Sequence, residues 1–378
     1  MAMLARIQPL KQLVNEMLDQ LPKSVWRSKT TTFLDPAIGG GQFVAEIERR
    51  LRAAGHNDEN IKSRVFGFEY SLALIDIAIN MNKLVGTYKK MLYEDFFKWD
   101  TDMKFDVIIG NPPYQSEKGT GTQPLWPLFV HAAYNMLSAD GYMAMITPNK
   151  WCGHTANVIK GGVHLYADIF KGKMVECNIQ ECSKYFPKVG GYANCFSYFI
   201  INNSGADSFE AVTLDGTYTV SKDQFTSLPL IKLTKLTSSI LTKVNTDESY
   251  NFSQVSSGFT NTNEGAVVIS MAQRLHYEKL NIYYDKNTSV TATSKSTVSK
   301  KKFSKSSQKK VDAVFRSKLF KFIHMIYWNN DNFGTNFYNS LPFLDLNLLW
   351  TDETIYDHFK FTNAERNYID KCVEVNVK

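Results

Sequence analysis

Apolar positions in the first 200 residues follow two patterns that alternate along the chain. In one, apolar residues recur at every third or fourth position, which predicts amphipathic helices. In the other, short runs of mostly apolar residues predict buried strands. We expect helices over residues 7–18, 42–54, 72–84 and 125–137, and strands over 31–34, 65–68, 105–109, 142–146 and 192–201. This alternation predicts an α/β fold with a Rossmann-like, doubly wound and mostly parallel sheet.

The alternation stops after residues 202–205, where Asn-Asn-Ser-Gly follows the last predicted strand. We therefore place a domain boundary there, with one domain over 1–204 and a second over 205–378. Within the second domain, residues 288–307 are rich in Ser, Thr and Lys and poor in apolar residues. This composition indicates a mobile basic loop or arm, which we place at 286–310. A solvated linker is the alternative interpretation.

Positive charge is concentrated in that second domain. The 378-residue chain has a formal charge of +6, but the window from Lys286 to Lys321 holds eleven Lys or Arg and one Asp. The window therefore carries +10 and the remainder −4, a distribution that would attract a phosphate backbone. With 44% hydrophobic residues but no apolar stretch typical of a signal peptide or membrane span, we expect a cytoplasmic protein without a membrane partner.

The cysteines give little support to a disulfide framework or a zinc site. They are odd in number and contain no Cys-x-x-Cys pair. The five are Cys152, Cys177, Cys182, Cys195 and Cys372. We expect reduced thiols and no metal.

A glycine-rich loop joins the first predicted strand to its helix. It reads Asp35-Pro36-Ala37-Ile38-Gly39-Gly40-Gly41 and lies where open α/β sheets bind ligands. Glycines let the backbone approach a ligand closely. A simple turn is the alternative, and the lack of a Gly-x-Gly-x-x-Gly pattern argues against a dinucleotide.

Acidic residues follow the next two predicted elements. Glu69 ends the second strand, where a carboxylate could accept hydrogen bonds from both ribose hydroxyls of a nucleoside; a solvent-exposed strand end is the alternative. Asp95 is a third acidic residue that we expect at the end of a strand. The pair Asp95-Phe96 could supply an acceptor for an adenine amine and an aromatic face for its ring.

The most specific motif is Asn111-Pro112-Pro113-Tyr114, directly after the strand 105–109 and Gly110. An aromatic amine is a poor nucleophile because its lone pair is delocalised into the ring. The Asn111 carboxamide oxygen and the Pro112 carbonyl oxygen can each accept one amine hydrogen and favour a pyramidal nitrogen. The two prolines stiffen the turn, and Tyr114 offers a stacking face for an extruded base. A rigid turn without chemistry is the alternative.

These motifs resemble those of the amino-methyltransferase superfamily, and specifically the γ-class N6-adenine DNA methyltransferases of restriction-modification type. The family's Asp-Pro-x-x-Gly-x-Gly-x-Phe loop is matched by Asp35, Pro36, Gly39, Gly41 and Phe43, its second-strand acid by Glu69, its Asp-Phe pair by Asp95 and Phe96, and its catalytic tetrapeptide by Asn111 to Tyr114. The resemblance implies S-adenosylmethionine as the cofactor, bound by these residues together with Ala37, Ile38, Tyr70 and Asn111. It also implies double-stranded DNA as the substrate, and a prokaryotic or phage source.

The resemblance extends to weaker motifs on either side. Gln8-Pro9 stands where the family has a Thr-Pro that contacts the cofactor's methionine end, and Phe196 or Tyr198 would form a second wall of the target-base pocket. The motif order places an α+β target-recognition domain last. In it we expect DNA contacts from seven lysines: Lys295, Lys300, Lys301, Lys302, Lys305, Lys309 and Lys310.

Two other functions fit the same tetrapeptide. One is an amino-methyltransferase that acts on an RNA base or on protein glutamine, and the other is a catalytically weak specificity subunit that only binds DNA. The basic second domain favours DNA, and Asn111, Tyr114 and Glu69 favour an active enzyme. No segment has spare length for a nuclease domain, so a cognate restriction endonuclease would be a separate protein.

Overall fold

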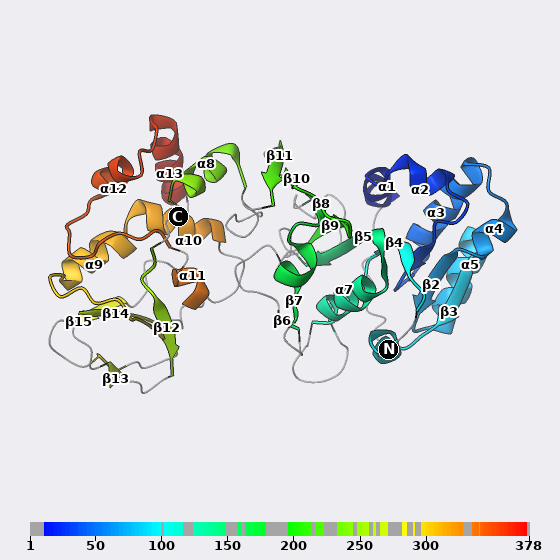
Figure 1. Ribbon diagram of the computed structural model, residues 1–378, viewed down its shortest axis with the longest axis horizontal. Helices are drawn as coiled ribbons and strands as arrows, with labels where there is room; N and C mark the ends of the chain where they lie inside the picture. The colour runs from blue at the N-terminus through cyan, green and yellow to red at the C-terminus, as the bar shows by residue number, and fades with distance from the viewer. Residues whose placement is uncertain are drawn as a thin grey trace. The chain divides into compact units, whose positions relative to one another are not determined.

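The protein is described by a computed structural model that divides into two compact units (Figure 1). Unit 1 comprises Met1–Trp151 and Ala156–Thr226, and unit 2 comprises Cys152–Thr155 and Ser227–Lys378. The structure describes residues 11–99, 102–115, 124–148, 151, 158–159, 163–178, 196–213, 216–222, 233–244, 248–256, 260–261, 265–270, 282–285, 290–291, 296–327, 335–339 and 341–375.

Unit 1 is built on a nine-stranded sheet. Its strands are β1 (Phe33–Asp35), β2 (Val65–Glu69), β3 (Thr87–Lys90), β4 (Phe105–Gly110), β5 (Leu137–Pro148), β8 (Met174–Asn178), β9 (Phe196–Asn202), β10 (Ser208–Thr213) and β11 (Gly216–Ser221), in the order β11-β10-β8-β9-β5-β4-β1-β2-β3. The strands from β5 to β3 pair in parallel, and β9 runs antiparallel to both of its neighbours. The predicted doubly wound, mostly parallel sheet is confirmed.

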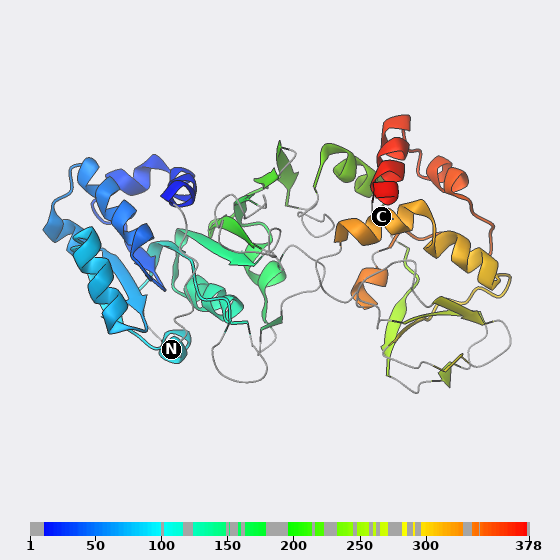
Figure 2. The ribbon, with the colours of Figure 1, turned by 180° about the vertical axis from the view of Figure 1, so that it is seen from behind.

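Helices cover both faces of this sheet (Figure 2). On one face, α1 (Lys11–Asp19), α3 (Gln42–Ala53) and α5 (Leu72–Asn82) contribute to a buried apolar cluster with alternate residues of the strands, such as Val107 and Ile109. Aromatic side chains join the other face to α6 (Tyr93–Phe97) and α7 (Trp126–Asn135), because Phe96 packs against both Phe68 and Phe129. Shorter elements are α2 (Lys23–Arg27), α4 (Asp58–Lys62), the two-stranded β6 (Val158–Ile159) and β7 (Val163–His164), and a π-helix at Leu165–Phe170.

Two details of unit 1 differ from the sequence prediction. Asp95 is not an acidic strand end, because β3 stops at Lys90 and Asp95 lies within α6. The sheet also continues beyond residue 205, the predicted boundary, because β10 pairs with β8 and β11 pairs with β10.

Unit 2 has a separate, antiparallel sheet. Its four strands are β12 (Phe252–Val255), β17 (Ser296–Ser299), β14 (Ala266–Ser270) and β15 (Ile282–Asp285), in that order, and β13 (Thr260–Asn261) pairs with β16 (Val290–Thr291). Four consecutive side chains of β17 are buried, so 296–299 is a central strand although it falls within the segment predicted as a basic loop.

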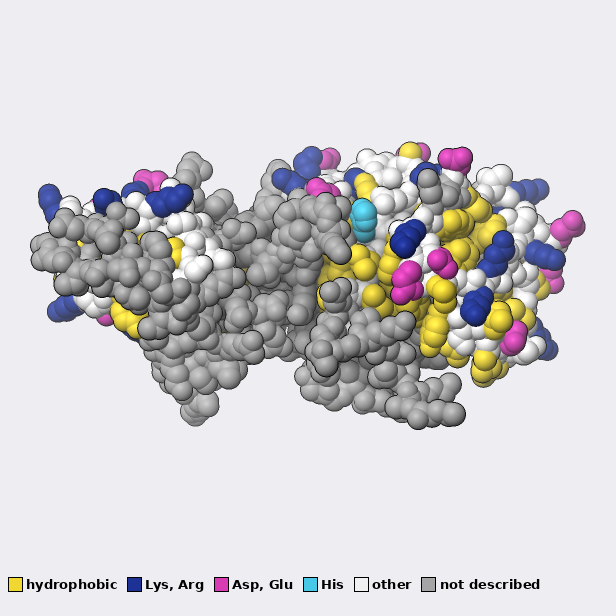
Figure 3. Space-filling model, turned by 90° about the horizontal axis from the view of Figure 1, so that it is seen from below, with side chains coloured by type: hydrophobic (Ala, Val, Ile, Leu, Met, Phe, Trp, Pro, Cys, Tyr) yellow, Lys and Arg dark blue, Asp and Glu magenta, His cyan; other side chains and the backbone are white. Residues whose placement is uncertain are grey.

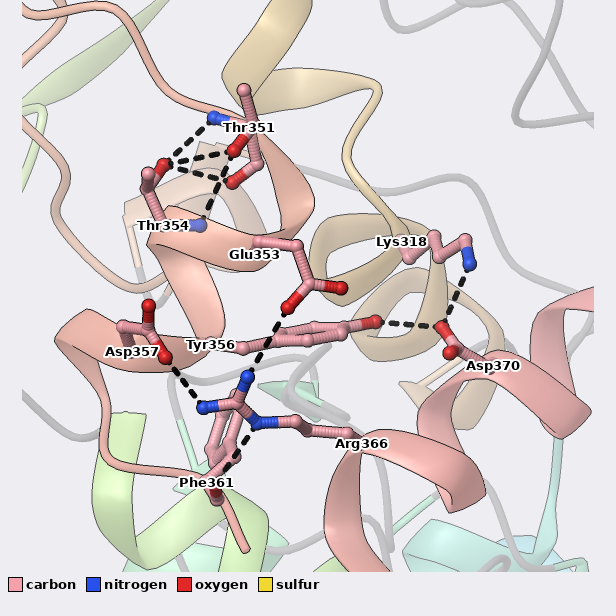
Figure 4. A network of polar contacts seen from close by, with 9 residues as sticks. All are labelled: Lys318, Thr351, Glu353, Thr354, Tyr356, Asp357, Phe361, Arg366 and Asp370. Atoms are coloured by element: carbon pink, nitrogen blue, oxygen red, sulfur yellow. Dashed lines mark hydrogen bonds and ion pairs between the residues drawn. The ribbon is translucent and has the colours of Figure 1, made fainter. Parts of the chain in front are cut away.

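The helices of unit 2 are α8 (Lys235–Val244), α9 (Gln308–Phe315), α10 (Lys318–Tyr327), α11 (Thr335–Asn339), α12 (Asp352–His358) and α13 (Asn363–Val375). A polar network ties α12 to α13, with the Arg366 guanidinium 5.7 Å from the ring centroid of Tyr356 and hydrogen-bonded to Asp357 at 2.6 Å (Figure 4). The Tyr356 hydroxyl donates to Asp370 at 2.9 Å, and Lys318 pairs with the same carboxylate. Unit 2 is thus an α+β domain whose C-terminal helices are joined by ion pairs and hydrogen bonds.

Candidate functional site

The strand order of unit 1 reverses at β1. From β1 the chain continues to β2 on one side, whereas β4 pairs with β1 on the other, with Leu34 opposite Ile108. Ligands of open α/β sheets bind in the crevice outside the carboxyl ends of the strands at such a point. The residues that end these strands, Asp35 and Gly110, come just before the glycine loop and the Asn-Pro-Pro-Tyr turn.

The glycine loop is tightly folded against the end of β4. The buried Asp35 carboxylate accepts a hydrogen bond from the Ala37 amide at 3.0 Å, and Gly39 and Gly41 have φ values of 50° and 83°. A Cβ atom at Gly110 would lie 2.7 Å from the Asp35 Oδ1 atom. Only glycine therefore permits this close approach of β4 to the loop.

Glu69 fastens the same loop to the end of β2. Its side chain is 1% exposed and accepts hydrogen bonds from the amides of Gly39 and Tyr70, each at 3.0 Å. The loop also packs on the strand, because a Cβ atom at Gly67 would lie 2.4 Å from the Ile38 Cγ2 atom. The glycine loop and Glu69, both predicted to bind the cofactor, are therefore held together by hydrogen bonds and packing.

The structure places the Phe96 side chain in the core, whereas the sequence predicted that it offers an aromatic face to adenine. Asp95 is exposed, but the Phe96 ring is 2% exposed and stacks on Phe129 with centroids 5.3 Å apart. Tyr70, by contrast, is 38% exposed and its ring lies 5.3 Å from that of Tyr93. Tyr93 was not predicted as a site residue. Its position three residues after the end of β3 is the signal that could have indicated it.

Exposed apolar side chains are numerous on unit 1. Figure 3 shows hydrophobic side chains, with charged ones among them, on the right-hand part of the view. The large hydrophobic residues that are exposed in the described part of unit 1 are Tyr70, Leu72, Ile77, Met81 and Leu92.

The Asn-Pro-Pro-Tyr turn is held by its own side chains and by the chain that returns to it. The Tyr114 hydroxyl donates to the Asn111 Oδ1 atom at 2.8 Å, and both side chains are partly buried. The Leu125 amide donates to the Tyr114 carbonyl oxygen at 2.9 Å, and Gln115 forms a β-bridge with Pro124. The carboxamide oxygen of Asn111 is therefore oriented by Tyr114.

The two residues predicted to wall a base pocket lie on β9. Tyr198 is 4% exposed, and its hydroxyl donates to the Glu176 Oε1 atom at 2.6 Å within the sheet. Burial raises the pKa of the Glu176 carboxyl against the opposing effect of that hydrogen bond. The backbone of Phe196 pairs with Pro148, and its side chain is outside the described part. The Tyr198 side chain thus belongs to the core.

The predicted lysines fall into two groups. Lys301 pairs with Glu248 at 2.6 Å, and the Lys310 Nζ atom donates to the Asn347 carbonyl oxygen at 2.6 Å. Four others are exposed, namely Lys300, Lys302, Lys305 and Lys309. Lys295 and the N-terminal Gln8 lie outside the described residues.

Among the residues that the structure describes, no three or more His, Cys, Asp or Glu side chains are grouped so that they could hold a metal ion. Of the cysteines in these ranges, Cys177 is buried and Cys372 is partly buried, and burial raises the pKa of the Cys177 thiol. No helix within the described ranges has the length and apolarity needed to cross a membrane.

Comparison with protein families matches residues 25–160 to the model of the Eco57I restriction-modification methylase. This range contains the glycine loop, Glu69 and the Asn-Pro-Pro-Tyr turn. The resemblance to restriction-modification methyltransferases that the sequence motifs indicated is confirmed over this range.

Two curated relatives cover part of the same chain. The type II methyltransferase M.CvrRI of Paramecium bursaria Chlorella virus XZ-6E is 33% identical over 84 residues, which are 22% of this chain and 18% of the relative. An uncharacterized adenine-specific methylase of Mycoplasma pneumoniae is 37% identical over 121 residues, which are 30% of this chain and 27% of the relative. The matches thus span about a fifth to a quarter of these relatives.

Solved structures were matched as well. The modification subunit of a putative type I restriction enzyme from Vibrio vulnificus YJ016 has 16% identity and a TM-score of 0.42, over 55% of this chain and 47% of that chain. A nuclease-deletion mutant of the type ISP restriction-modification enzyme LlaGI has 13% identity and a TM-score of 0.41, over 60% and 29%.

Proposed function

We propose that this chain is an S-adenosylmethionine-dependent DNA methyltransferase that methylates the N6 amine of an adenine extruded from duplex DNA. One observation supports this most strongly: the Asn111 to Tyr114 turn directly follows Gly110 of β4, which packs against Asp35 at the start of the glycine loop, at the point where the strand order reverses. The family match over residues 25–160 contains both parts.

The activation of the amine is assigned to Asn111 and Pro112. Their side-chain and backbone carbonyl oxygens would each accept one N6 hydrogen, which draws the lone pair out of conjugation with the ring. A carboxamide oxygen has two lone pairs, so Asn111 can accept from the base while it accepts from Tyr114. The Tyr114 ring would stack on the extruded base.

The fit of the cofactor rests on the loop and Glu69. S-adenosylmethionine supplies a methyl group already activated as a sulfonium, so neither a metal nor a strong base is required. The close approaches at Gly67 and Gly110 hold the loop backbone on the strand ends. Glu69, which is 1% exposed and accepts from the Gly39 amide, would accept the ribose hydroxyls with the lone pairs that its carboxylate has left. Tyr70, rather than the buried Phe96, is the exposed aromatic residue next to that carboxylate.

Unit 2 is assigned to duplex recognition. Its basic segment between Lys286 and Lys321 carries +10.

The test is the variant Asn111→Ala, assayed with labelled S-adenosylmethionine and plasmid DNA. Methyl transfer should be abolished, because the amine loses its side-chain acceptor, while cofactor binding by calorimetry stays close to that of the wild type. Asn80→Ala, an exposed residue on α5, is the matched control and should keep full activity. Wild-type turnover in Asn111→Ala would refute the assigned role.

A further inference from the structure

A shallow hollow of about 380 Å³ lies on unit 1 between α2 and the C-terminal half of α3 (Figure 1). This volume is within the range of pockets that hold one small molecule. Its lining includes Asp19, Trp26 and four cationic side chains, which are Lys23, Arg27, Arg49 and Arg50. The hollow therefore combines the size of a small-ligand site with a concentration of positive charge.

One wall of the hollow is held in place by contacts within the protein. The Trp26 ring stacks on Phe33 with centroids 5.6 Å apart, and the Arg50 guanidinium lies 5.3 Å from the Trp26 ring centroid. Arg50 also pairs with Asp19 at 2.8 Å and donates to the Asn15 Oδ1 atom at 3.0 Å. Because the indole is already engaged by a ring and a guanidinium, it acts as a wall, and the choice of ligand depends on the cations.

Glu46 fixes a second arginine beside this wall. Its carboxylate is 6% exposed and accepts two hydrogen bonds from Arg49, at 2.8 and 2.6 Å, and one from Arg50 at 2.9 Å. The hydrogen bond from Arg49 lowers the pKa of the Glu46 carboxyl against the opposing effect of burial, so Glu46 is ionised at neutral pH. A guanidinium has five N–H donors, and Glu46 takes two of those of Arg49. Arg49, whose side chain is 61% exposed, is thus positioned and retains donors for a ligand.

The two cations of α2 complete the hollow. Lys23 and Arg27 are four residues apart on this helix, so their side chains lie on the same face, and both are exposed. Among the residues that the structure describes, neither forms an ion pair with a carboxylate. Both side chains are therefore available to a ligand in the hollow.

The net charge around the hollow indicates the class of the ligand. Four cations line it, and the carboxylates of Asp19 and Glu46 neutralise two of these charges, which leaves +2. The dipole at the C-terminal end of α3 contributes about −0.5, so about +1.5 remains. A phosphate monoester carries about −1.5 to −2 near pH 7, whereas a carboxylate or one phosphate of a nucleic-acid backbone carries a single charge. The charge thus matches a phosphate monoester, whose oxygens also suit the forked donors of arginine.

We propose that this hollow binds a small molecule that carries a phosphate monoester, with Lys23, Arg27 and Arg49 in contact with the phosphate. The site is separate from the glycine loop. Helix α3 has 12 residues and is about 18 Å long; it begins at the loop, and its last residues reach the hollow. The inference goes beyond the proposed methyltransferase function and does not depend on it.

The experiment measures binding of inorganic phosphate and of phenyl phosphate to the full chain by calorimetry, at about pH 8 and constant ionic strength, with acetate as the carboxylate probe. The wild type should bind both phosphates and not acetate. The double variant Lys23→Gln, Arg27→Gln should bind them roughly tenfold more weakly, because each exposed ion contact contributes up to about fivefold. The double variant Lys89→Gln, Lys90→Gln on β3 removes the same two charges from other exposed positions and should bind as the wild type does.

Three results would overturn the inference. The first is a wild type that binds neither phosphate, and the second is wild-type affinity for both phosphates in Lys23→Gln, Arg27→Gln. The third is weaker binding of a labelled DNA duplex in that variant without any binding of the phosphates, because the hollow would then belong to a nucleic-acid surface. The ligand-free variant should unfold at the wild-type temperature, since both side chains are exposed. If it does not, the single variant Arg27→Gln decides by the same criteria.

Discussion

The hydrogen bond from Tyr114 to Asn111 leads to a prediction that distinguishes the role of the Tyr114 hydroxyl from that of the Tyr114 ring. In Tyr114→Phe the carboxamide of Asn111 loses the donor that orients its Oδ1 atom at 2.8 Å. A neutral hydrogen bond contributes about 0.5–1.5 kcal/mol, so the rate constant for methyl transfer should fall roughly 2- to 13-fold. Tyr114→Ala also removes the stacking face, which should lower productive binding of the base by roughly a further 5- to 160-fold.

Single-turnover kinetics provide the assay, with enzyme in excess over plasmid DNA and labelled S-adenosylmethionine saturating. The affinity for S-adenosylmethionine should stay the same in both variants. Tyr142→Phe, which removes a hydroxyl from the body of β5, is the control and should react at the wild-type rate. An unchanged or faster rate in Tyr114→Phe would show that the hydroxyl does not position Asn111.

Three further predictions concern the scaffold. Gly110→Ala places a Cβ atom 2.7 Å from Asp35 Oδ1, so it should lower the free energy of unfolding by about 1–3 kcal/mol and weaken cofactor binding, as checked by denaturant titration and calorimetry. Tyr198→Phe leaves the buried Glu176 without its donor and should cost about 1–3 kcal/mol of stability without slowing methyl transfer; a loss of base binding in this variant would instead place Tyr198 in the pocket. Burial alone would raise the pKa of Glu365, but hydrogen bonds from Lys243, Ser239 and Thr362 lower it from 4.5 to about 2. Its stabilisation should thus be complete above pH 4.5 and lost as the pH falls toward 2, about 3 kcal/mol in all; Glu365→Gln should flatten that loss in urea unfolding curves, and an equally steep loss in the variant would contradict the assignment.

Much of unit 1 could be predicted because its signals are local. The helix at 42–54 and the strands at 65–68 and 105–109 match α3, β2 and β4 closely, since the apolar period and the glycines both lie within each segment. The structure adds that the Asp35 loop meets Gly110, because the carboxyl ends of parallel strands share one edge of a sheet.

Asp95-Phe96 could not be placed from the sequence. The pair has the expected spacing after a strand, but whether Phe96 faces a ligand or the core depends on Phe129, which is 33 positions away and stacks on it. Tyr198 presents the same difficulty. Its alternating strand pattern gives two faces, and only the pairing of β9 with β8 brings Glu176 to its hydroxyl.

The strand β17 was not predicted, because its residues have a composition typical of a loop. Ser296 to Ser299 are mostly polar, yet all four are buried, because small hydroxyl side chains can satisfy their hydrogen bonds within a sheet. Ser299 accepts from the Val267 amide at 2.9 Å and donates to the Lys301 carbonyl oxygen at 3.0 Å. A composition rich in Ser and Thr thus indicated a loop where tertiary pairing makes a central strand.

The position of the transferred methyl group tests the central claim most directly. The wild-type chain would be incubated with labelled S-adenosylmethionine in an equal mixture of plasmid DNA, RNA and cell protein, and the modified plasmid would then be mapped by single-molecule sequencing. We predict label on DNA alone, at the N6 position of adenine within one short recurring sequence, and none with Asn111→Ala. Label on RNA or on protein glutamine, with unmodified plasmid, would contradict the account.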